Sequence, residues 1–517
     1  MRTVAGPTDH VVVVGAGLAG LATALHLLGA GRRVTVLERE PHPGGRAGRL
    51  ELDGYRVDTG PTVLTMPDLV EEAFAAVGDR LADRLDLVRL DPAYRARFAD
   101  GSTIDVHTDA EAMEAEVRAV AGPAEAAGYR RLRDWLTALY RTELGRFIGA
   151  NFDSPLDLVA SPAAVRDLAR LAVLGGFGRL GPQVGRFVRD ERLRRIFSFQ
   201  ALYAGVPPRR ALAAYAVIAY MDTVAGVYFP RGGMHALPRA LADAAADAGA
   251  EFRYGAEVSA LERTGDRVTA VRTSGGERVA ADAVVLTPDL PVVHRLLGRT
   301  PRRPVPLRWS PSAVVLHAGV RPGSTGAWPD LAHHTISFGA AWEQTFDEII
   351  HTGRLMSDPS LLVTRPTATD ASLAPDGREL LFVLAPCPNL QTAPLDWHAV
   401  GPAYRDEIIG VLERRGLTGL GDAIEAEHLV TPADWAAQGL AAGTPFSAAH
   451  SFAQTGPFRS GNLVRGLDNV VLAGCGTTPG VGVPTVLLSG RLAAERIVAS
   501  PNSTHRAPRR ATTHQPL

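Results

Sequence analysis

Glycines and an acid near the start of the chain have the types and spacing of a dinucleotide site. The turn Gly15-Ala16-Gly17-Leu18-Ala19-Gly20 matches the pattern G-x-G-x-x-G and follows four consecutive valines. Gly15 permits the tight bend, Gly17 lets the backbone approach a pyrophosphate, and Gly20 lets helix and strand pack closely. Glu38 follows eighteen residues after Gly20, where a carboxylate accepts hydrogen bonds from an unphosphorylated ribose. A glycine turn that serves packing alone is the alternative.

A second glycine turn indicates which dinucleotide is bound. Pro43-Gly44-Gly45-Arg46-Ala47-Gly48 begins soon after Glu38. A unit that binds NAD needs no further glycine turn there. FAD is longer, and a second turn with an arginine can meet its pyrophosphate and its flavin side. Gly44, Gly45 and Arg46 are therefore expected to bind FAD.

A third glycine loop lies close to the end of the chain. Residues 470–484 have the order of a strand, a glycine loop and the start of a helix. Backbone N–H groups at that helix start are expected to face the N1–C2=O edge of a flavin and to favour its reduction. The full set of predicted cofactor contacts is Gly15, Gly17, Gly20, Glu38, Gly44, Gly45, Arg46, Val258, Gly474, Gly480, Val481 and Gly482.

A parallel sheet must position these residues. Val11–Val14 is a β-branched run typical of a strand buried on both faces, residues 18–28 predict a helix, and residues 33–37 predict a second strand. The sequence thus predicts an α/β fold with a Rossmann-type FAD-binding domain. Its predicted segments are 8–110, 226–295 and 466–500, and the segment 226–295 includes an expected strand at 251–258. A mixed-sheet substrate domain is expected at 296–465, a helical, membrane-associating cap at 111–225, and a disordered tail at 501–517.

Composition narrows the class of protein. The 517 residues are 46% hydrophobic and 21% charged, as in a globular protein, and a net charge of −1 gives no reason to expect a nucleic-acid partner. Two cysteines cannot form a disulfide framework, so a reducing compartment is expected.

Residues 1–9 lack the apolar core of a signal peptide, and no apolar run is long enough for a transmembrane helix. His333 and His334 would point to opposite faces of a strand, so no metal site is predicted.

The chain contains no lysine, because all 54 basic residues are arginine. No lysine can therefore act as a base or hold a water beside a flavin.

The run from Val12 to Thr62 resembles the start of the flavin amine oxidase superfamily. Within it the chain resembles the bacterial carotenoid desaturases of the phytoene desaturase type, as do residues 226–237 (GVYFPRGGMHAL), 331–339 (LAHHTISFG) and 470–484. The resemblance covers about residues 10–498. It implies FAD-dependent desaturation of phytoene toward lycopene, with hydride transfer from an allylic C–H to the flavin. It also implies that quinone or oxygen reoxidises the flavin.

Motif matches to this family suggest two catalytic carboxylates. Asp134 occupies an acidic position of similar enzymes, although Thr137 stands where they often carry an arginine. Asp222 lies just before the Gly226 motif, where others have a glutamate. Such groups stabilise a substrate cation or accept its proton. The alternative for each is a solvated or ion-paired helix carboxylate.

The segment 160–210 is strongly basic. Its arginines are interleaved with apolar residues, and three acids leave a balance of +7; the arginines are at 166, 170, 179, 186, 189, 192, 194, 195, 209 and 210. Such a segment suits an anionic lipid surface. We expect a cytoplasmic protein on the inner face of the cell membrane that draws a lipophilic polyene from the bilayer. A solvated helical cap is the alternative.

Other functions remain open at this point. One is a desaturase, ketolase or isomerase of another carotenoid or diapocarotenoid. A second is a flavin amine oxidase on a soluble amine, against which the missing lysine counts. A third is a non-catalytic flavoprotein that carries a lipid.

Overall fold

A five-stranded parallel sheet forms the centre of the first domain in the computed structural model, which describes residues 1–202, 204–301, 305–321, 328 and 331–499. Its order is β10-β2-β1-β14-β20, from Glu251–Arg253, Arg33–Leu37, His10–Val14, Ala283–Leu286 and Val470–Leu472. Every neighbouring pair is parallel. The strands come from three distant parts of the chain, so this domain is discontinuous in sequence.

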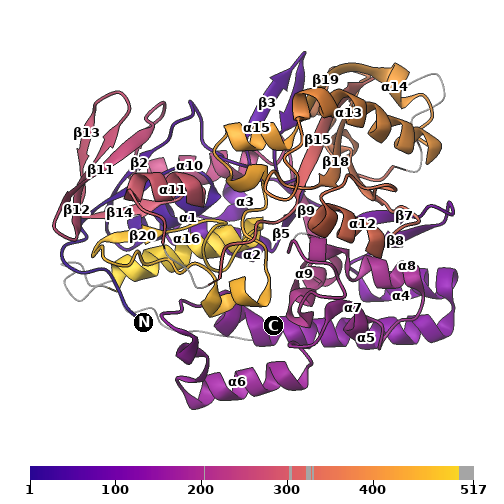
Figure 1. The fold of residues 1–517 in the computed structure, drawn as a ribbon, viewed down its shortest axis with the longest axis horizontal. Coiled ribbons are helices and arrows are strands. Elements are labelled where there is room, and N and C mark those ends of the chain that lie inside the picture. Colours follow the sequence, from indigo (N-terminus) through magenta and orange to yellow (C-terminus); the bar gives the residue numbers. More distant parts are fainter. Residues whose placement is uncertain (203, 302–304, 322–327, 329–330, 500–517) are drawn as a thin grey trace.

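Helices cover one face of this sheet, and a second sheet at residues 258–280 together with the helix at residues 290–297 covers the other, which explains why Val11–Val13 are fully buried. Helix α1 (Leu18–Gly29) packs against α16 (Val483–Val498) and α10 (Ala236–Asp247), with α2 (Pro67–Ala75) beside them (Figure 1). Gly490 makes the α1–α16 contact possible, because a Cβ there would lie 2.5 Å from the carbonyl oxygen of Ala19. The short helices α3 (Leu81–Arg84) and α11 (Leu290–Leu297) complete this part.

A seven-stranded mixed sheet forms the second domain. Its order is β19-β15-β18-β17-β16-β7-β8, from Ile424–Val430, Ser312–Val320, Glu379–Cys387, Leu361–Thr364, His334–Ser337, Tyr94–Arg97 and Thr103–Val106. The hairpin β7-β8 was expected in the FAD-binding domain, but β7 pairs in parallel with β16 and so joins this sheet. Around the sheet lie α12 (Glu343–Asp347), η6 (Glu348–Thr352), η7 (Pro366–Ala368), η8 (Ala371–Leu373), α13 (Trp397–Arg414), α14 (Leu420–Ala423), α15 (Pro432–Ala437), η9 (Ala441–Gly443), η10 (Phe452–Gln454) and η11 (Gly456–Phe458).

The described part of the chain also forms three smaller sheets. A three-stranded sheet of β11 (Val258–Thr264), β12 (Arg267–Thr273) and β13 (Arg278–Ala280) lies beyond the parallel sheet. The strand predicted at 251–258 ends earlier than predicted, at Arg253. Gly255 turns the chain with a φ of +68°, and Val258 begins β11 instead. The remaining strands are β3 (Arg49–Leu52), β4 (Tyr55–Asp58), β5 (Leu64–Thr65), β6 (Leu87–Arg89) and β9 (Val227–Pro230).

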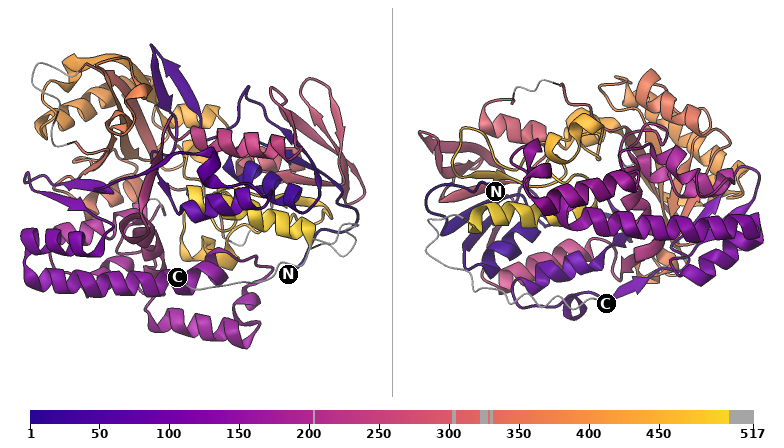
Figure 2. Two further views of the ribbon diagram at one scale, coloured as in Figure 1. Left: turned by 180° about the vertical axis from the view of Figure 1, so that it is seen from behind. Right: turned by 90° about the horizontal axis from the view of Figure 1, so that it is seen from below.

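The cap between residues 110 and 225 is helical. It comprises α4 (Ala110–Ala121), α5 (Pro123–Glu143), η1 (Leu144–Ile148), η2 (Pro155–Val159), α6 (Pro162–Val173), α7 (Leu180–Val184), α8 (Glu191–Ile196), η3 (Phe199–Leu202), η4 (Ala213–Tyr215), α9 (Ala216–Tyr220) and η5 (Met221–Ala225). Two of these elements, η1 and η5, are π-helical turns. Helix α6 projects below the body of the molecule when it is viewed from the front or from behind (Figures 1 and 2).

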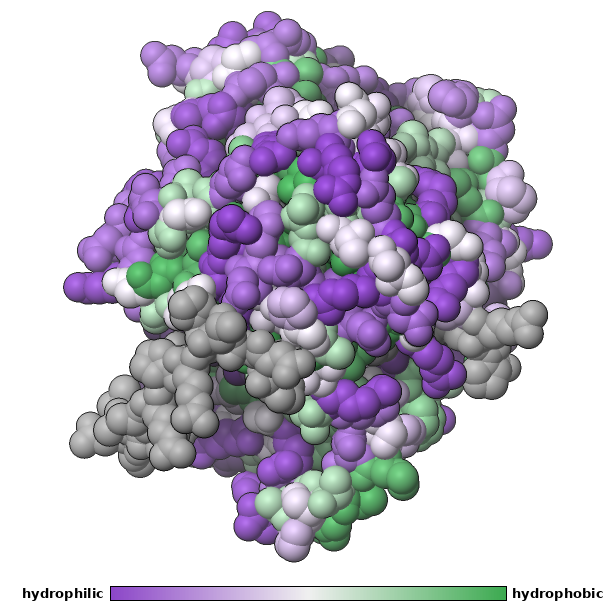
Figure 3. Space-filling model, turned by 90° about the vertical axis from the view of Figure 1, so that its left-hand side faces the viewer, coloured by the Kyte–Doolittle hydropathy of each residue, from purple (hydrophilic) through white to green (hydrophobic). Residues whose placement is uncertain are grey.

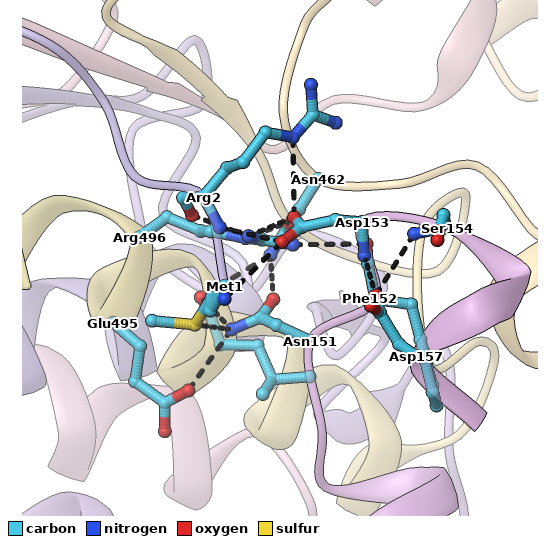
Figure 4. A network of polar contacts seen from close by, with 11 residues as sticks. Met1, Arg2, Asn151, Phe152, Asp153, Ser154, Asp157, Asn462, Glu495 and Arg496 are labelled. Atoms are coloured by element: carbon cyan, nitrogen blue, oxygen red, sulfur yellow. Dashed lines mark hydrogen bonds and ion pairs between the residues drawn. The ribbon is translucent and has the colours of Figure 1, made fainter. Parts of the chain in front are cut away.

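A buried arginine fastens the base of this projecting lobe to the first domain. Arg496 of α16 is only 1% exposed and donates to Asn462 Oδ1 at 2.9 Å and to Asp153 Oδ1 at 2.6 Å (Figure 4). It also donates to the carbonyl oxygen of Phe152 at 3.1 Å. Asn151 donates to the carbonyl oxygen of Leu492 at 3.1 Å, so the segment before η2 is held along α16.

No helix in the described part of the chain combines the length and the apolar content needed to cross a bilayer. The predicted tail at 501–517 lies outside the described residues.

Candidate functional site

One cavity of about 1040 Å³ runs from the carboxyl ends of the parallel strands into the space between the mixed sheet and the cap. Ten of the twelve predicted cofactor residues line its first part: Gly15, Gly17, Glu38, Gly44, Gly45, Arg46, Val258, Gly474, Val481 and Gly482. Gly20 and Gly480 are not among the lining residues. The cavity therefore brings together segments that are more than 400 residues apart in the sequence.

The first two glycine turns form one continuous backbone surface. Gly17 and Gly44 pair as an isolated bridge, and the Gly44 N–H donates to the carbonyl oxygen of Ala16 at 3.0 Å. A Cβ at Gly17 would face the cavity and lie no nearer than 3.9 Å to Gly44 and Gly45. Gly17 is the N-cap of α1 without any side-chain cap, so the first N–H groups of the helix are available to an anion.

Close packing around this turn leaves no room for a side chain at Gly15 or Gly20. Gly15 has a φ of +104°, and a Cβ there would lie 2.3 Å from Thr287 Oγ1. A Cβ at Gly20 would lie 2.0 Å from the carbonyl oxygen of Gly15. Gly20 thus acts by close packing, as its place in the pattern predicts, and does not itself face the cavity.

Glu38 lies at the end of β2 on the cavity wall. Its carboxylate accepts hydrogen bonds from the Ala16 N–H at 2.6 Å and the Glu40 N–H at 3.0 Å. The side chain therefore holds the glycine turn against the strand end. Its predicted contact with a ribose remains a prediction.

Arg46 provides a partly buried cation next to the two turns. Its guanidinium forms an ion pair with Asp289 at 3.3 Å between Nη2 and Oδ2. Its buried Nε has no hydrogen-bond partner among the described residues. A donor left unpaired on the wall of a cavity is costly unless a ligand accepts its hydrogen bond, which agrees with the predicted role of Arg46.

The third glycine loop packs on a histidine that the sequence analysis did not identify. A Cβ at Gly480 would lie 2.2 Å from His450 Cε1, so the loop and the imidazole are in direct contact. His450 lines the cavity, its Nε2 has no partner among the described residues, and burial lowers its pKa well below the usual value. Arg459 fixes the loop by donating to the carbonyl oxygens of Cys475 at 2.6 Å and Thr477 at 3.1 Å. No sequence spacing links these two residues to the loop.

The second part of the cavity is lined chiefly by apolar side chains. They come from the cap, from the mixed sheet and from α15: Phe147, Ile148, Phe199, Leu212, Val217, Ile218, Met221, Val315, Leu362, Phe382, Leu384 and Trp435. We call this part the apolar chamber.

Of the two predicted catalytic carboxylates, only Asp222 lies in the chamber wall. It belongs to the π-turn η5, and burial raises its pKa to about 7, although a hydrogen bond with Gln200 partly opposes this. Asp134 is exposed on α5 and is not among the lining residues. The structure therefore does not bring Asp134 to the site, because it lies on the solvent face of its helix.

A carboxyl group that the sequence analysis missed takes part in the chamber. Glu143, the last residue of α5, lines the cavity and is 4% exposed. Its Oε1 has no partner among the described residues, and burial raises its pKa well above the usual value. The sequence contains a signal for this residue. Leu132, Leu136 and Leu139 have the helical spacing of a buried face of α5, and Glu143 continues that spacing.

Exposed residues line the cavity at two places of opposite character. At the end of β2 they are polar, namely Arg39, Glu40 and Gln438. Beneath the cap they are aromatic: Phe177, Phe452 and Phe458 are 47%, 58% and 41% exposed. The chamber thus has an apolar mouth.

Further exposed apolar residues lie near this mouth. We define the apolar tip as Leu156, Val159, Val165, Val173, Phe177, Phe452 and Phe458, of which Val173 is 88% exposed. Figure 3 shows hydrophobic side chains gathered on the lobe at the bottom of the molecule.

The predicted basic segment divides into two groups. Arg166, Arg170 and Arg179 are exposed on or beside α6. Arg195 is buried, pairs with Glu191, and donates to the carbonyl oxygen of Gly339 at 2.7 Å. Arg192 pairs with Asp190 at 2.8 Å. Arg192 and Arg195 are therefore held by internal partners and do not fit the expectation that the segment faces a surface, whereas the other eight arginines of the segment are exposed.

Known proteins match nearly the whole chain. A family model described as flavin containing amine oxidoreductase matches residues 18–498. A phytoene dehydrogenase of Streptomyces griseus is 72% identical over 99% of both chains. A zeta-carotene-forming phytoene desaturase of Myxococcus xanthus is 39% identical over 95% of this chain and 94% of that protein. A structure of putrescine oxidase bound to putrescine shares the fold, with a TM-score of 0.60 and 17% identity over 96% of this chain and 99% of that one.

Proposed function

The chain belongs to the flavin containing amine oxidoreductase family, and on that premise we propose that it is an FAD-dependent phytoene desaturase of carotenoid biosynthesis. The observation that carries this proposal is the single cavity that joins a dinucleotide-binding surface to the apolar chamber. A long hydrocarbon substrate fits such a chamber, and the 72% identical relative is named a phytoene dehydrogenase. We further propose that the reaction proceeds toward lycopene.

The residues of the first part of the cavity fit FAD. Gly17 leaves room for a pyrophosphate at the free N-terminus of α1, and the unpaired Nε of Arg46 offers a donor beside it. Glu38 lines the same part of the cavity, where its carboxylate would accept hydrogen bonds from a ribose, and Gly482 is the N-cap of α16, whose first N–H groups would face the flavin edge. When bound, FAD supplies an acceptor for the hydride of an allylic C–H bond.

The chamber residues favour a hydrocarbon over a soluble amine. Apolar side chains exclude water, so a positive charge that forms on the substrate must be stabilised by the protein. Asp222 is a candidate for this role, because its pKa of about 7 leaves a substantial carboxylate fraction near neutral pH.

We propose that the apolar tip dips into the inner face of the cell membrane. Its seven residues surround or adjoin the mouth of the chamber, so that a polyene would pass from lipid into protein without crossing water. Arg166, Arg170 and Arg179 lie near the tip, where they would meet anionic headgroups. Reoxidation of the flavin by a quinone or by oxygen belongs to the same proposal.

The test uses purified protein, FAD and anionic liposomes loaded with phytoene, with a quinone or oxygen as acceptor. New long-wavelength polyene bands after extraction would support desaturation, and their positions would count the double bonds formed. Unchanged phytoene in the presence of bound FAD and an acceptor would refute the proposal. Conversion of another carotenoid, or of an amine, under the same conditions would identify the alternative.

A further inference from the structure

Glu143 is a buried acid with no role in the function proposed so far. We propose that Glu143 is a second catalytic carboxyl group, which accepts the proton that the substrate loses during desaturation. The inference rests on the proposed function and identifies the base that the reaction needs.

The surroundings of Glu143 point to a ligand in the chamber. Its side chain makes no hydrogen bond or ion pair within the described part of the chain, and one of its oxygens is fully enclosed. Phe147 and Ile148, which follow on the next turn, are apolar parts of the same wall. A carboxyl group without a partner in such a place destabilises a protein, and groups of this kind concentrate at functional sites.

Backbone geometry places Glu143 and Asp222 in the same wall. Glu143 immediately precedes the π-turn η1, and Asp222 lies within the π-turn η5. The rings of Tyr140 and Tyr220 stack at 4.2 Å between centroids, which ties α5 to α9 just before the two acids. Isolated π-turns are rare and occur frequently at functional sites.

The Glu143 carboxyl group is available to a substrate in the chamber, because its side chain lines the cavity and makes no hydrogen bond or ion pair among the described residues. In the reaction, one C–H bond of the substrate gives up a hydride with two electrons to FAD, which leaves an allylic cation. The neighbouring C–H bond then breaks, its electron pair becomes the new C=C bond, and its proton passes to the Glu143 carboxylate.

Burial favours this proton transfer. Before it, the apolar chamber holds a cation and a carboxylate; after it, the chamber holds a neutral alkene and a neutral carboxylic acid. Burial raises the pKa of Glu143 and so disfavours its carboxylate in the empty chamber, whereas an allylic cation in the chamber stabilises the carboxylate until the proton is transferred. The acid formed must lose its proton to water before the next turnover.

The experiment compares E143Q with the wild-type protein, both loaded with FAD, on phytoene in anionic liposomes. Glutamine has the same shape but accepts no proton, so we expect turnover to fall by about 100-fold or more. FAD content and liposome binding should stay unchanged. The thermal unfolding midpoint should stay equal or rise, since an unpartnered buried carboxyl group is removed. E143D should recover part of the activity.

Thr142→Val serves as the matched control, because Thr142 is buried next to Glu143 but is not part of the cavity wall. Turnover by E143Q equal to that of the wild type would overturn the inference alone. A fall in FAD content and unfolding midpoint would assign Glu143 a structural role and would also overturn it. A wild-type protein that leaves phytoene unchanged would overturn the proposed function itself.

Discussion

Gly17 borders free space in the cavity, where a ligand could lie. The space on its cavity side is bordered by Gly44 and Gly45, and none of these residues has a side chain there. Other glycines of the site have internal reasons for their identity, as Gly15 and Gly20 do through close contacts within the turn. Gly17 is therefore the position at which FAD binding is tested most directly.

We expect Gly17→Val to abolish FAD binding while the fold persists, because the valine side chain would occupy the place of the pyrophosphate. Flavin absorbance of the purified variant measures this. Gly461→Val is the matched control, since Gly461 is exposed and a Cβ there meets no atom within 4 Å. A Gly17 variant with normal flavin content would contradict the assignment of this surface.

We expect Asp222→Asn to slow the reduction of bound flavin by phytoene by roughly 100-fold, with FAD content unchanged. In the wild type, the carboxylate fraction of Asp222 falls as the pH drops through about 7, so reduction should slow in acid. Stopped-flow absorbance across this pH range provides the measurement. Asp134→Asn should have no effect, and an equal loss in both variants would remove Asp222 from the site.

Individual residues also show which parts of the site can be predicted from the sequence and which cannot. The three glycine motifs contain eight of the ten predicted residues that line the cavity, and Glu38 and Val258 are the other two. Asp134 was placed by motif match alone, and the solvent face of α5 removes it from the site. Glu143 was missed because an acid within a buried helical stripe was not weighed as a functional signal.

At the scale of elements, local patterns predicted the first βαβ unit closely. The predicted strand 33–37 coincides with β2, and the predicted helix 18–28 differs from α1 by one residue. Such elements depend on neighbouring residues in the sequence. The pairing of β7 with β16 joins residues about 240 positions apart and leaves no local trace, so its sheet could not be predicted.

Helix α6 with its flanking turns carries the proposed membrane contact. We expect R166E/R170E to reduce co-sedimentation with anionic liposomes, because both side chains are exposed near the apolar tip. FAD content should not change. The matched control R239E/R263E reverses two exposed arginines of the first domain and should sediment like the wild type. Equal losses in both variants would favour a general charge effect over a specific surface.

At the scale of the whole molecule, the cavity connects two openings of opposite polarity. We expect Phe177→Ser with Phe452→Ser to slow uptake of phytoene from liposomes, because both rings are exposed at the apolar mouth. FAD content should stay unchanged, because neither ring belongs to the predicted FAD contacts. Turnover measured with phytoene in detergent micelles is the control, and a loss of the same size there would place the defect inside the chamber.

On the proposed membrane contact, the apolar mouth makes the rate depend on the concentration of phytoene in the bilayer. A substrate that enters from lipid is diluted by other lipids and not by buffer, so its mole fraction in the bilayer sets the rate. Adding empty vesicles at constant total phytoene should then inhibit, although nothing in them competes for the chamber. Adding water should have no effect once the protein is bound, because buffer does not dilute a substrate that is dissolved in the bilayer.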